Sequence, residues 1–301
     1  MLVIAKKVGR LANRLLLFAQ FIAAAAEHGF SVANPSFGPY FRYFPSTARD
    51  LLCRFPIRAS LPAPPLPREM LYRLTLLAAS LLAARQRRGR DVGLIRLRRD
   101  QRLDLETPEF LTPLRRHRTL FVQDWNFRGP NLCERHRDIV RDFFVPFEHH
   151  VARSRELLEP ARSRGHFLVG VHIRRRDYAA FKSGRYFYTY AQYRAWMEAT
   201  VRAFPDRGVA FLLCSDAPVP VAAFAGLEVQ YGNGHELEDL YALAGCDRLF
   251  GPPSTYGRWA SYWGAVPRFT IFDPASPLSA ESFHVDTTLS PRPRPAADGV
   301  A

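Results

Sequence analysis

Residues 169–178 read VGVHIRRRDY, an apolar run that ends abruptly in a histidine, three arginines and an aspartate. The apolar run begins at Phe167, and strands buried on both faces of a parallel sheet have continuous apolar sequences of this kind. Ligands of open α/β sheets bind at the carboxyl ends of the strands. Arginine suits an anionic ligand there, because its planar guanidinium binds phosphate through two parallel hydrogen bonds. The stretch therefore predicts a buried strand that leads into an anion-binding loop.

A solvated surface loop is the alternative explanation for these arginines, because arginine is abundant throughout the chain. Two features favour a site instead. His172 still lies within the alternation of the strand, and Asp177 can pair with one of the arginines. Burial of such groups is costly unless they are paired, so their presence at a strand end indicates a function.

The pattern H-x-R-R-x-D-Y, formed by His172, Arg174, Arg175, Asp177 and Tyr178, resembles the signature of the fucosyltransferase superfamily. That superfamily includes bacterial α-1,2-fucosyltransferases, α-1,6-fucosyltransferases and protein O-fucosyltransferases. The chain most resembles the bacterial α-1,2 group, of the family 11 type. That group often has glycine where the third arginine of the run stands here, so this chain has an added charge beside the expected phosphate site.

A second part of the resemblance lies near the amino terminus, in VGRLANRLLLFAQFIAAAAEHG at residues 8–29. The family's first strand is followed by a similar G-x-x-x-N loop and a helix. Here residues 2–4 would form the strand, and Gly9 and Asn13 would form a loop that contacts the donor. Glycine lets backbone approach a ligand closely. Asn13 is the expected N-cap of a helix over residues 13–27, and Gly29 is its expected stop.

A third part is GPPSTYGRWASYWGA at residues 251–265, which resembles the family's carboxyl-terminal serine- and tryptophan-rich motif. Ser254 and Thr255 would stand at a helix start, where backbone N–H groups and hydroxyls hold phosphate. The alternative is a capped core helix that packs through Trp259 and Trp263. FLLCSD at residues 211–216 resembles a further family strand, and its final Asp216 could accept hydrogen bonds from guanine.

The composition indicates a globular chain, with 301 residues of which 48% are hydrophobic. This length is sufficient for two domains. The four cysteines are scattered without a C-x-x-C pair, which argues against a structural zinc site or a disulfide framework and favours a reduced, cytoplasmic setting. The amino terminus lacks the apolar core of a signal peptide, and no apolar stretch has the roughly 18 residues of a membrane span.

The net charge is +14, and lysine contributes only Lys6, Lys7 and Lys182. Codon usage that favours arginine is one explanation; an anionic ligand, an acidic membrane surface or a nucleic acid are the others. The sequence has no RNA-binding signature in which aromatic residues alternate with basic ones, so no nucleic-acid partner is expected. Residues 70–84 form an apolar helical pattern followed by arginines, which predicts either a membrane-surface helix or a helix packed on its own protein.

Strand and helix patterns alternate along the chain, which predicts parallel sheets of an α/β fold. Strands are expected at 2–4, 31–33, 119–123, 167–173, 209–215, 227–231, 248–251 and 269–272, and helices at 13–27, 131–144, 149–158, 190–203, 237–245 and 256–264. The resemblance implies two Rossmann-like lobes in the B-type glycosyltransferase architecture. We expect an acceptor-side lobe at 1–160, a lobe that binds the nucleotide sugar at 161–289, and a disordered tail at 290–301.

The resemblance implies an inverting transfer of L-fucose from GDP-fucose to a glycan hydroxyl, with no metal and no other cofactor. Such a transfer requires electrostatic stabilisation of the departing diphosphate. Arg174 is the first candidate for this catalytic role, and Arg175 either assists in it or is structural. His172 and Asp177 would orient the arginines and line the donor site.

Two other functions remain open from the sequence. One is a glycosyltransferase with another nucleotide-sugar donor, and the other is a basic protein that binds nucleic acid. The acceptor, and a possible peripheral contact with an anionic membrane at its inner face, are not identified by any motif. Asp124 follows a strand of the first lobe and could face the cleft, or it could pair with an arginine, so no general base is assigned.

Overall fold

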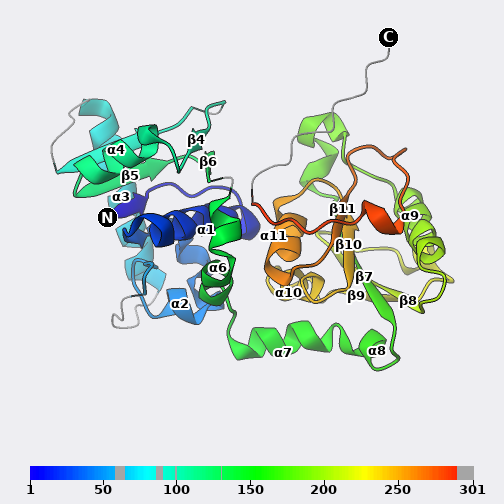
Figure 1. The fold of residues 1–301 in the computed structure, drawn as a ribbon. Coiled ribbons are helices and arrows are strands. Elements are labelled where there is room, and N and C mark those ends of the chain that lie inside the picture. Colours follow the sequence, from blue (N-terminus) through cyan, green and yellow to red (C-terminus); the bar gives the residue numbers. More distant parts are fainter. Residues whose placement is uncertain (58–64, 86–90, 99, 130, 290–301) are drawn as a thin grey trace, which may run out of the picture.

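The computed structural model describes residues 1–57, 65–85, 91–98, 100–129 and 131–289, excluding the side chain of Arg85. The predicted tail at 290–301 and the arginines at 87, 88 and 90 lie outside the described residues. The described chain forms an α/β structure of two lobes that lie side by side, with the amino-terminal half in one and the carboxyl-terminal half in the other (Figure 1).

The N-terminal lobe is built on a four-stranded sheet in which every pairing is parallel. Its order is β2 (Val32–Ala33), β1 (Leu2–Ile4), β5 (Thr119–Gln123) and β3 (Val92–Arg96). A separate parallel pair is formed by β4 (Leu103–Asp104) and β6 (Phe127–Arg128). Because the strands are parallel, the loops that follow β1 and β5 leave the sheet at the same edge.

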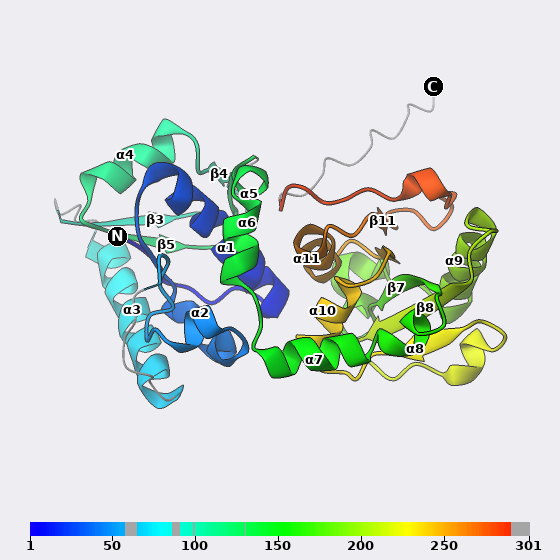
Figure 2. The ribbon, with the colours of Figure 1, turned by 60° about the horizontal axis from the view of Figure 1, so that its bottom comes forward.

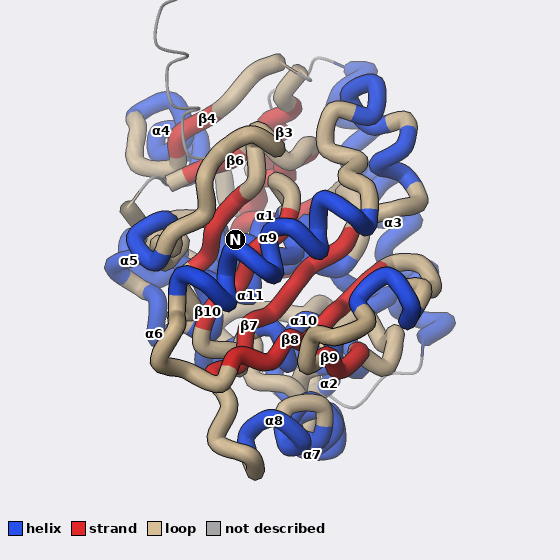
Figure 3. Tube along the Cα trace, turned by 90° about the vertical axis from the view of Figure 1, so that its right-hand side faces the viewer, coloured by secondary structure: helices blue, strands red, loops and turns tan. Residues whose placement is uncertain are grey.

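The C-terminal lobe contains a five-stranded parallel sheet of order β11 (Arg268–Thr270), β10 (Arg248–Gly251), β7 (Phe167–Ile173), β8 (Val209–Ser215) and β9 (Val229–Tyr231). Figure 3 shows β10, β7, β8 and β9 side by side. The central strand β7 is buried at all seven residues, which explains its unbroken apolar sequence. The two main sheets therefore take their strands from either side of the predicted boundary at residue 160.

Helices cover both sheets and connect the lobes. In the N-terminal lobe they are α1 (Leu11–His28), η1 (Pro35–Tyr43), α2 (Pro45–Ala48), α3 (Pro65–Arg85), α4 (Pro108–Arg116), α5 (Leu132–Arg135) and α6 (Arg137–Phe143). The connection is made by α7 (Glu148–Glu156) and α8 (Glu159–Arg162), which run beneath the C-terminal lobe in Figure 2. That lobe has α9 (Tyr190–Ala203), α10 (Glu238–Leu243), α11 (Thr255–Gly264) and the short turns η2 (Asp177–Ala179), η3 (Phe181–Gly184), η4 (Val221–Phe224) and η5 (Ala280–Ser282).

The two lobes share one buried apolar cluster across their junction, where α1 and α11 are in contact. The rings of Phe144 and Trp259 meet edge to face at 5.2 Å. The Tyr262 hydroxyl donates to the Cys133 carbonyl at 2.6 Å, so a buried hydrogen bond also crosses the junction. Aromatic pairs of this kind add about 0.5–1.5 kcal/mol beyond the burial itself. The junction is thus a packed core, which fixes how the loops of the two sheets face each other.

Most expected elements are present, but several differ from the prediction. The strands β3, β4 and β6 and the helix α4 were not expected. The strands β4 and β6 have only two residues each, too few for a pattern, and β3 is a single run of five, VGLIR, followed by further arginines. The expected helix 131–144 is broken into α5 and α6 at His136, whose φ of −108° and ψ of 30° are not helical. The strand expected at 227–231 begins only at Val229.

The helix expected at 70–84 forms as α3 and starts earlier, at Pro65, where proline is favoured in the first helical turn. It contacts η1 and β3 of its own lobe. No helix within the described ranges combines the length and the apolar character required to cross a membrane.

Candidate active site

A cavity of about 930 Å³ lies where loops of both sheets meet. From the C-terminal lobe it is lined by residues at the carboxyl ends of β7, β8, β9 and β10, and from the N-terminal lobe by residues 9–13 and Trp125. Small-molecule sites of proteins have volumes of about 300–1,000 Å³ and favour this edge of parallel sheets. Nine residues were predicted as site residues; eight line this cavity, namely Gly9, Asn13, His172, Arg174, Asp177, Asp216, Ser254 and Thr255.

Arg174 is held in the cavity wall by two carboxylates. Its Nη1 lies 3.3 Å from Oδ2 of Asp216, and its Nη2 forms a short ion pair with Oδ1 of Asp177. The guanidinium also lies 4.9 Å from the ring centre of Tyr178. The Arg174 side chain is only 15% exposed, so these contacts are partly shielded from water. The arginine is therefore oriented before any ligand arrives, which lowers the cost of organising it around an anion.

Arg175 is the predicted site residue that does not line the cavity. Its guanidinium donates to the carbonyl of Tyr188 at 2.8 Å and lies over the rings of Phe187 and Tyr190, at 4.0 and 4.6 Å. Its side chain therefore leaves the loop on the side away from the cavity, which favours the structural role of Arg175 over the catalytic one. Only its backbone contributes, because Arg175 N–H donates to Oδ1 of Asp216 at 2.8 Å.

That hydrogen bond also changes the expectation for Asp216. Oδ1 accepts the Arg175 N–H, and Oδ2 lies within ion-pair distance of Arg174. Oδ2 is buried and has no hydrogen-bond partner within the described residues. We therefore assign Asp216 to the positioning of Arg174.

His172 is the penultimate residue of β7, is 4% exposed, and stacks on the Tyr256 ring at 4.8 Å. Burial, with the charges of Arg174 and Arg268, lowers the pKa of His172 well below its usual value, so the ring is neutral near pH 7. Within the described part of the chain its Nδ1 has no hydrogen-bond partner. A buried polar atom without a partner is uncommon in folded proteins, and here it lies at the wall of the cavity.

The glycine and asparagine of the amino-terminal loop depend on each other. Gly9 has φ of +52°, and a Cβ there would lie 1.9 Å from Nδ2 of Asn13. Only glycine leaves room for that amide. Arg14 then fixes the loop, because its Nε and Nη2 donate to the Gly9 carbonyl at 3.3 and 3.2 Å and its Nη1 donates to that of Ser36 at 3.1 Å.

Asn13 is not the N-cap that the sequence suggested. The helix begins at Leu11 after an N-cap at Arg10, and Asn13 stands in the first helical turn. The helix starts two residues earlier than expected, and the Asn13 side chain instead fills the space beside Gly9. The expected stop is confirmed, since Gly29 caps the helix with φ of +69°.

Ser254 is the N-cap of α11, as expected, and its side chain accepts from the Tyr256 N–H. Thr255 is the first helical residue. This end of α11 faces the cavity, where the first N–H groups of a helix attract anions. Tyr178 links the arginine loop to this helix start, because its hydroxyl donates to the Pro253 carbonyl at 2.7 Å.

The loop between β9 and α10 forms a wall of the cavity that sequence reasoning missed. It includes Gly232, Asn233, Gly234 and Glu236. Oδ1 of Asp239, which is also in the lining, accepts the N–H of Asn233 at 2.9 Å, and burial raises the pKa of Asp239 to about 6. A Cβ on Gly232 would come within 2.4 Å of that carboxylate. The signal was present in the sequence as Y-G-N-G directly after a strand.

The charge of the cavity is mixed despite the basic composition of the chain. Within the described lining, three arginines (Arg10, Arg174 and Arg176) face four carboxylates (Asp177, Asp216, Glu236 and Asp239). Such a concave, mixed surface recognises a ligand with a localised anionic group, whereas a nucleic-acid backbone requires an extended basic surface.

Asp124 lies next to this cavity but is not itself part of the lining, which includes its neighbour Trp125. It pairs with Lys6 at 3.6 Å, not with an arginine, and its φ of +102° is unusual for an aspartate. Lys6 and Asp124 follow β1 and β5, whose loops leave the same edge of the N-terminal sheet.

The fold is that of B-type glycosyltransferases. It is similar to a mutant of FUT1 from Arabidopsis thaliana in complex with GDP, with TM-score 0.60 and 13% identity over 96% of this chain and 75% of that one. It is also similar to fucosyltransferase NodZ from Bradyrhizobium, with TM-score 0.50 and 19% identity over 90% of this chain and 95% of that one. The NodZ α-1,6-fucosyltransferase soaked with GDP-fucose matches at TM-score 0.50 and 18% identity, over 91% and 97%.

No protein-family model matches the chain, and the search of curated proteins finds no match. The structural likeness therefore establishes a fucosyltransferase-like fold, and it does not identify the family 11 group suggested by the arginine motif.

Proposed function

We propose that the chain is a glycosyltransferase that moves L-fucose from GDP-fucose to a hydroxyl of a glycan acceptor with inversion, as in the family 11 group. The observation that carries the proposal is Arg174, held by two carboxylates in the wall of a cavity that also contains the start of α11. The GDP bound to the FUT1 mutant and the GDP-fucose soaked into NodZ support the choice of donor.

In the proposed reaction, an oxygen of the acceptor attacks the anomeric carbon of the donor from the face opposite the diphosphate. The bond from that carbon to the phosphate oxygen breaks, its electron pair remains on the departing GDP, and the acceptor hydroxyl gives up its proton. Negative charge grows on the diphosphate during this step. A fixed guanidinium stabilises that charge more than it stabilises the bound substrate, which is the requirement for catalysis.

The other residues have supporting roles in this proposal. Ser254 and Thr255, with the first N–H groups of α11, would hold the phosphates from the side opposite Arg174. His172 and Asp177 would complete the donor site. Gly9 and Asn13 approach from the N-terminal lobe, where the acceptor would enter.

We propose that the reaction requires no metal ion and no other cofactor, because arginine and helix N–H groups supply the positive charge. We also propose a cytoplasmic location. All four cysteines are free and buried, as is usual in a reducing compartment.

A peripheral contact with an anionic membrane would involve α3. Five large apolar side chains on this helix are 46–71% exposed, namely Leu66, Met70, Leu74, Leu77 and Leu81. Their spacing of three or four residues places them on one face. The exposed Arg73 and the net charge of +14 complement an anionic lipid surface. Sedimentation with phosphatidylglycerol vesicles tests this: Leu74→Glu with Leu77→Glu should abolish binding, and equal binding by this variant would contradict it.

The melting temperature in the presence of GDP, UDP or ADP tests the donor class. A ligand that binds only the native state stabilises it by about 2.7 kcal/mol at roughly 100 times its dissociation constant, which is measurable. GDP should give the largest shift, and the shift should shrink in Arg174→Ala and Ser254→Ala. A larger shift with UDP would indicate another nucleotide-sugar donor. No shift with any nucleotide, together with tight and salt-sensitive RNA binding, would favour a nucleic-acid-binding protein.

A further inference from the structure

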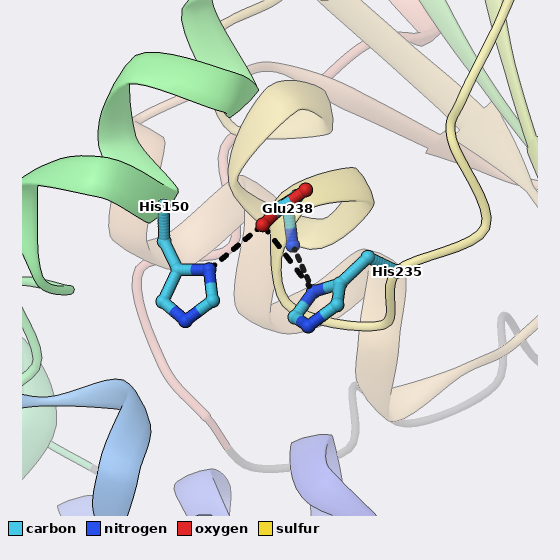
Figure 4. Close-up of side chains that lie close together, drawn as sticks. All are labelled: His150, His235 and Glu238. Atoms are coloured by element: carbon cyan, nitrogen blue, oxygen red, sulfur yellow. Dashed lines mark hydrogen bonds and ion pairs between the residues drawn. The ribbon is translucent and has the colours of Figure 1, made fainter.

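Two histidines and a glutamate converge outside the cavity lining, at the junction of the connector and the C-terminal lobe (Figure 4). His150 belongs to α7, His235 to the loop between β9 and α10, and Glu238 is the first residue of α10. One potential ligand atom from each lies within 4.8 Å of the others. His235 and Glu238 are neighbours in sequence, whereas His150 lies 88 positions from Glu238, so the fold brings His150 to this local pair.

A single carboxylate oxygen is directed at both imidazoles. Oε1 of Glu238 lies 2.8 Å from Nδ1 of His150 and 3.9 Å from Nδ1 of His235. The other oxygen, Oε2, accepts from Nδ2 of Asn233 at 2.6 Å. The carboxylate is therefore fixed by a neighbour in the way that metal-binding carboxylates usually are.

Ring packing also holds the two imidazoles. Their centres lie 5.1 Å apart with planes 29° from parallel. Tyr43 of the N-terminal lobe meets both rings, at 5.4 Å for His150 and 5.5 Å for His235. Side chains whose orientation is set by packing lose less conformational entropy when they bind a ligand.

The Nδ1 of His235 accepts a weak hydrogen bond from the Glu238 N–H at 3.4 Å. A cation bound at this nitrogen would replace that long hydrogen bond.

We propose that His150, His235 and Glu238 bind Zn²⁺ or a similar borderline divalent cation, through two imidazole nitrogens and one carboxylate oxygen. This ligand set is typical of zinc sites in which water fills the fourth position. Bonds of about 2.0–2.2 Å place neighbouring ligand atoms roughly 3.4 Å apart around a tetrahedron. Each of the two measured separations must then change by about half an ångström. The side chain of His235 is 37% exposed and is free to make that adjustment.

At His150, metal binding requires a shift of tautomer. Without metal, its Nδ1–H donates to Glu238; with metal, Nδ1 supplies the lone pair and Nε2 carries the proton. The imidazole stays neutral, and no proton is gained or lost.

The bound cation would connect α7 to the loop that forms one wall of the cavity. That loop also accepts a hydrogen bond from the N-terminal lobe, where the Tyr43 hydroxyl donates to Oε1 of Glu236 at 3.2 Å. The cation would thus stiffen the junction of the two lobes without entering the cavity. This inference does not depend on the proposed glycosyl transfer.

Titration of the metal-stripped protein with Co²⁺ tests the site, because tetrahedral Co²⁺ absorbs strongly in the visible range. We expect saturation at one equivalent, displacement by Zn²⁺, and an affinity lower by more than about 100-fold in His235→Ala, which removes a direct ligand. His149→Ala is the matched control. The His149 ring lies 4.1 Å from that of His150, but His149 is not a member of the cluster, so the Co²⁺ affinity of this variant should equal that of the wild type.

A second measurement separates a lost site from a damaged fold. Zn²⁺ should raise the melting temperature of the wild type and of His149→Ala, but not that of His235→Ala. Since His235 is partly exposed, its loss should leave the fold intact. Absence of Co²⁺ absorption, equal affinity in His235→Ala, or an intense near-ultraviolet band of thiolate ligation would each overturn the proposal.

Discussion

Arg174→Ala and Arg175→Ala should have opposite consequences, although the two arginines are adjacent. Arg174 faces the cavity between Asp177 and Asp216, whereas the Arg175 side chain packs on Phe187 and donates to the Tyr188 carbonyl. We expect Arg174→Ala to lose transfer and keep the fold. We expect Arg175→Ala to lose stability and keep its turnover per folded molecule.

The magnitudes follow from these contacts. Removal of one fixed donor that stabilises developing charge commonly costs about 100- to 1,000-fold in kcat, or roughly 2.7–4 kcal/mol. Asp216 keeps the hydrogen bond from the Arg175 N–H after Arg174→Ala, so stability should fall by only about 1–2 kcal/mol. Arg175→Ala removes a hydrogen bond and two cation–π contacts, which together contribute about 2–3 kcal/mol.

Initial rates of GDP release from GDP-fucose, normalised to the folded fraction, measure the first effect, and urea unfolding measures the second. Arg174→Lys belongs in the same series, because a point charge does not replace the planar fork and should also be slow. Near-wild-type turnover by folded Arg174→Ala would refute the proposed role. An equal loss of kcat in folded Arg175→Ala would show that the orientation of that side chain has been misread.

Three further predictions concern the loop, the metal and the pH. Gly9→Ala should lose most activity and at least about 1–2 kcal/mol of unfolding free energy, because a Cβ at positive φ is strained and collides with Asn13. Gly29→Ala, which has open space around it, should lose only the part due to backbone strain, as urea unfolding would show. Transfer activity should survive EDTA, and complete loss with rescue by Mg²⁺ would contradict the metal-free mechanism. The pKa of His172 is lowered in the folded state, so below about pH 6.5 the unfolded chain binds a proton at this residue that the folded chain does not. The free energy of unfolding should therefore decrease by about 1.4 kcal/mol for each pH unit below that value. His172→Gln should remove that slope, as chemical unfolding at a series of pH values would show.

Much of the fold could be predicted because the sequence changes from apolar to charged or polar residues where strands end. The buried strand β7 is apolar throughout and turns basic at Arg174, and Ser254 marks a helix start directly after β10. Parallel pairing then brings the ends of these neighbouring strands to one edge of the sheet. The sequence pattern is therefore sufficient to locate the site, because residues that follow neighbouring parallel strands lie at the same edge of the sheet.

The remainder could not be predicted because side-chain direction in a loop depends on its three-dimensional course. A run of three arginines does not by itself show where each side chain points. The Tyr188 carbonyl, which accepts from Arg175, lies 13 positions further along the chain. Asn13 looked like a cap because the space beside Gly9 is not visible in the sequence. The group of His150, His235 and Glu238 likewise forms only when α7 packs against α10.

Release of the nucleoside diphosphate from a panel of nucleotide sugars by the purified protein tests the central claim most directly. The panel contains GDP-fucose, GDP-mannose, UDP-glucose and ADP-glucose, with Arg174→Ala as the inactive control. The account predicts that GDP-fucose is turned over fastest, and that Arg174→Ala is slower by about 100-fold or more. Turnover of a UDP- or ADP-sugar in preference to GDP-fucose, or GDP-fucose turnover unaffected by Arg174→Ala, would contradict it.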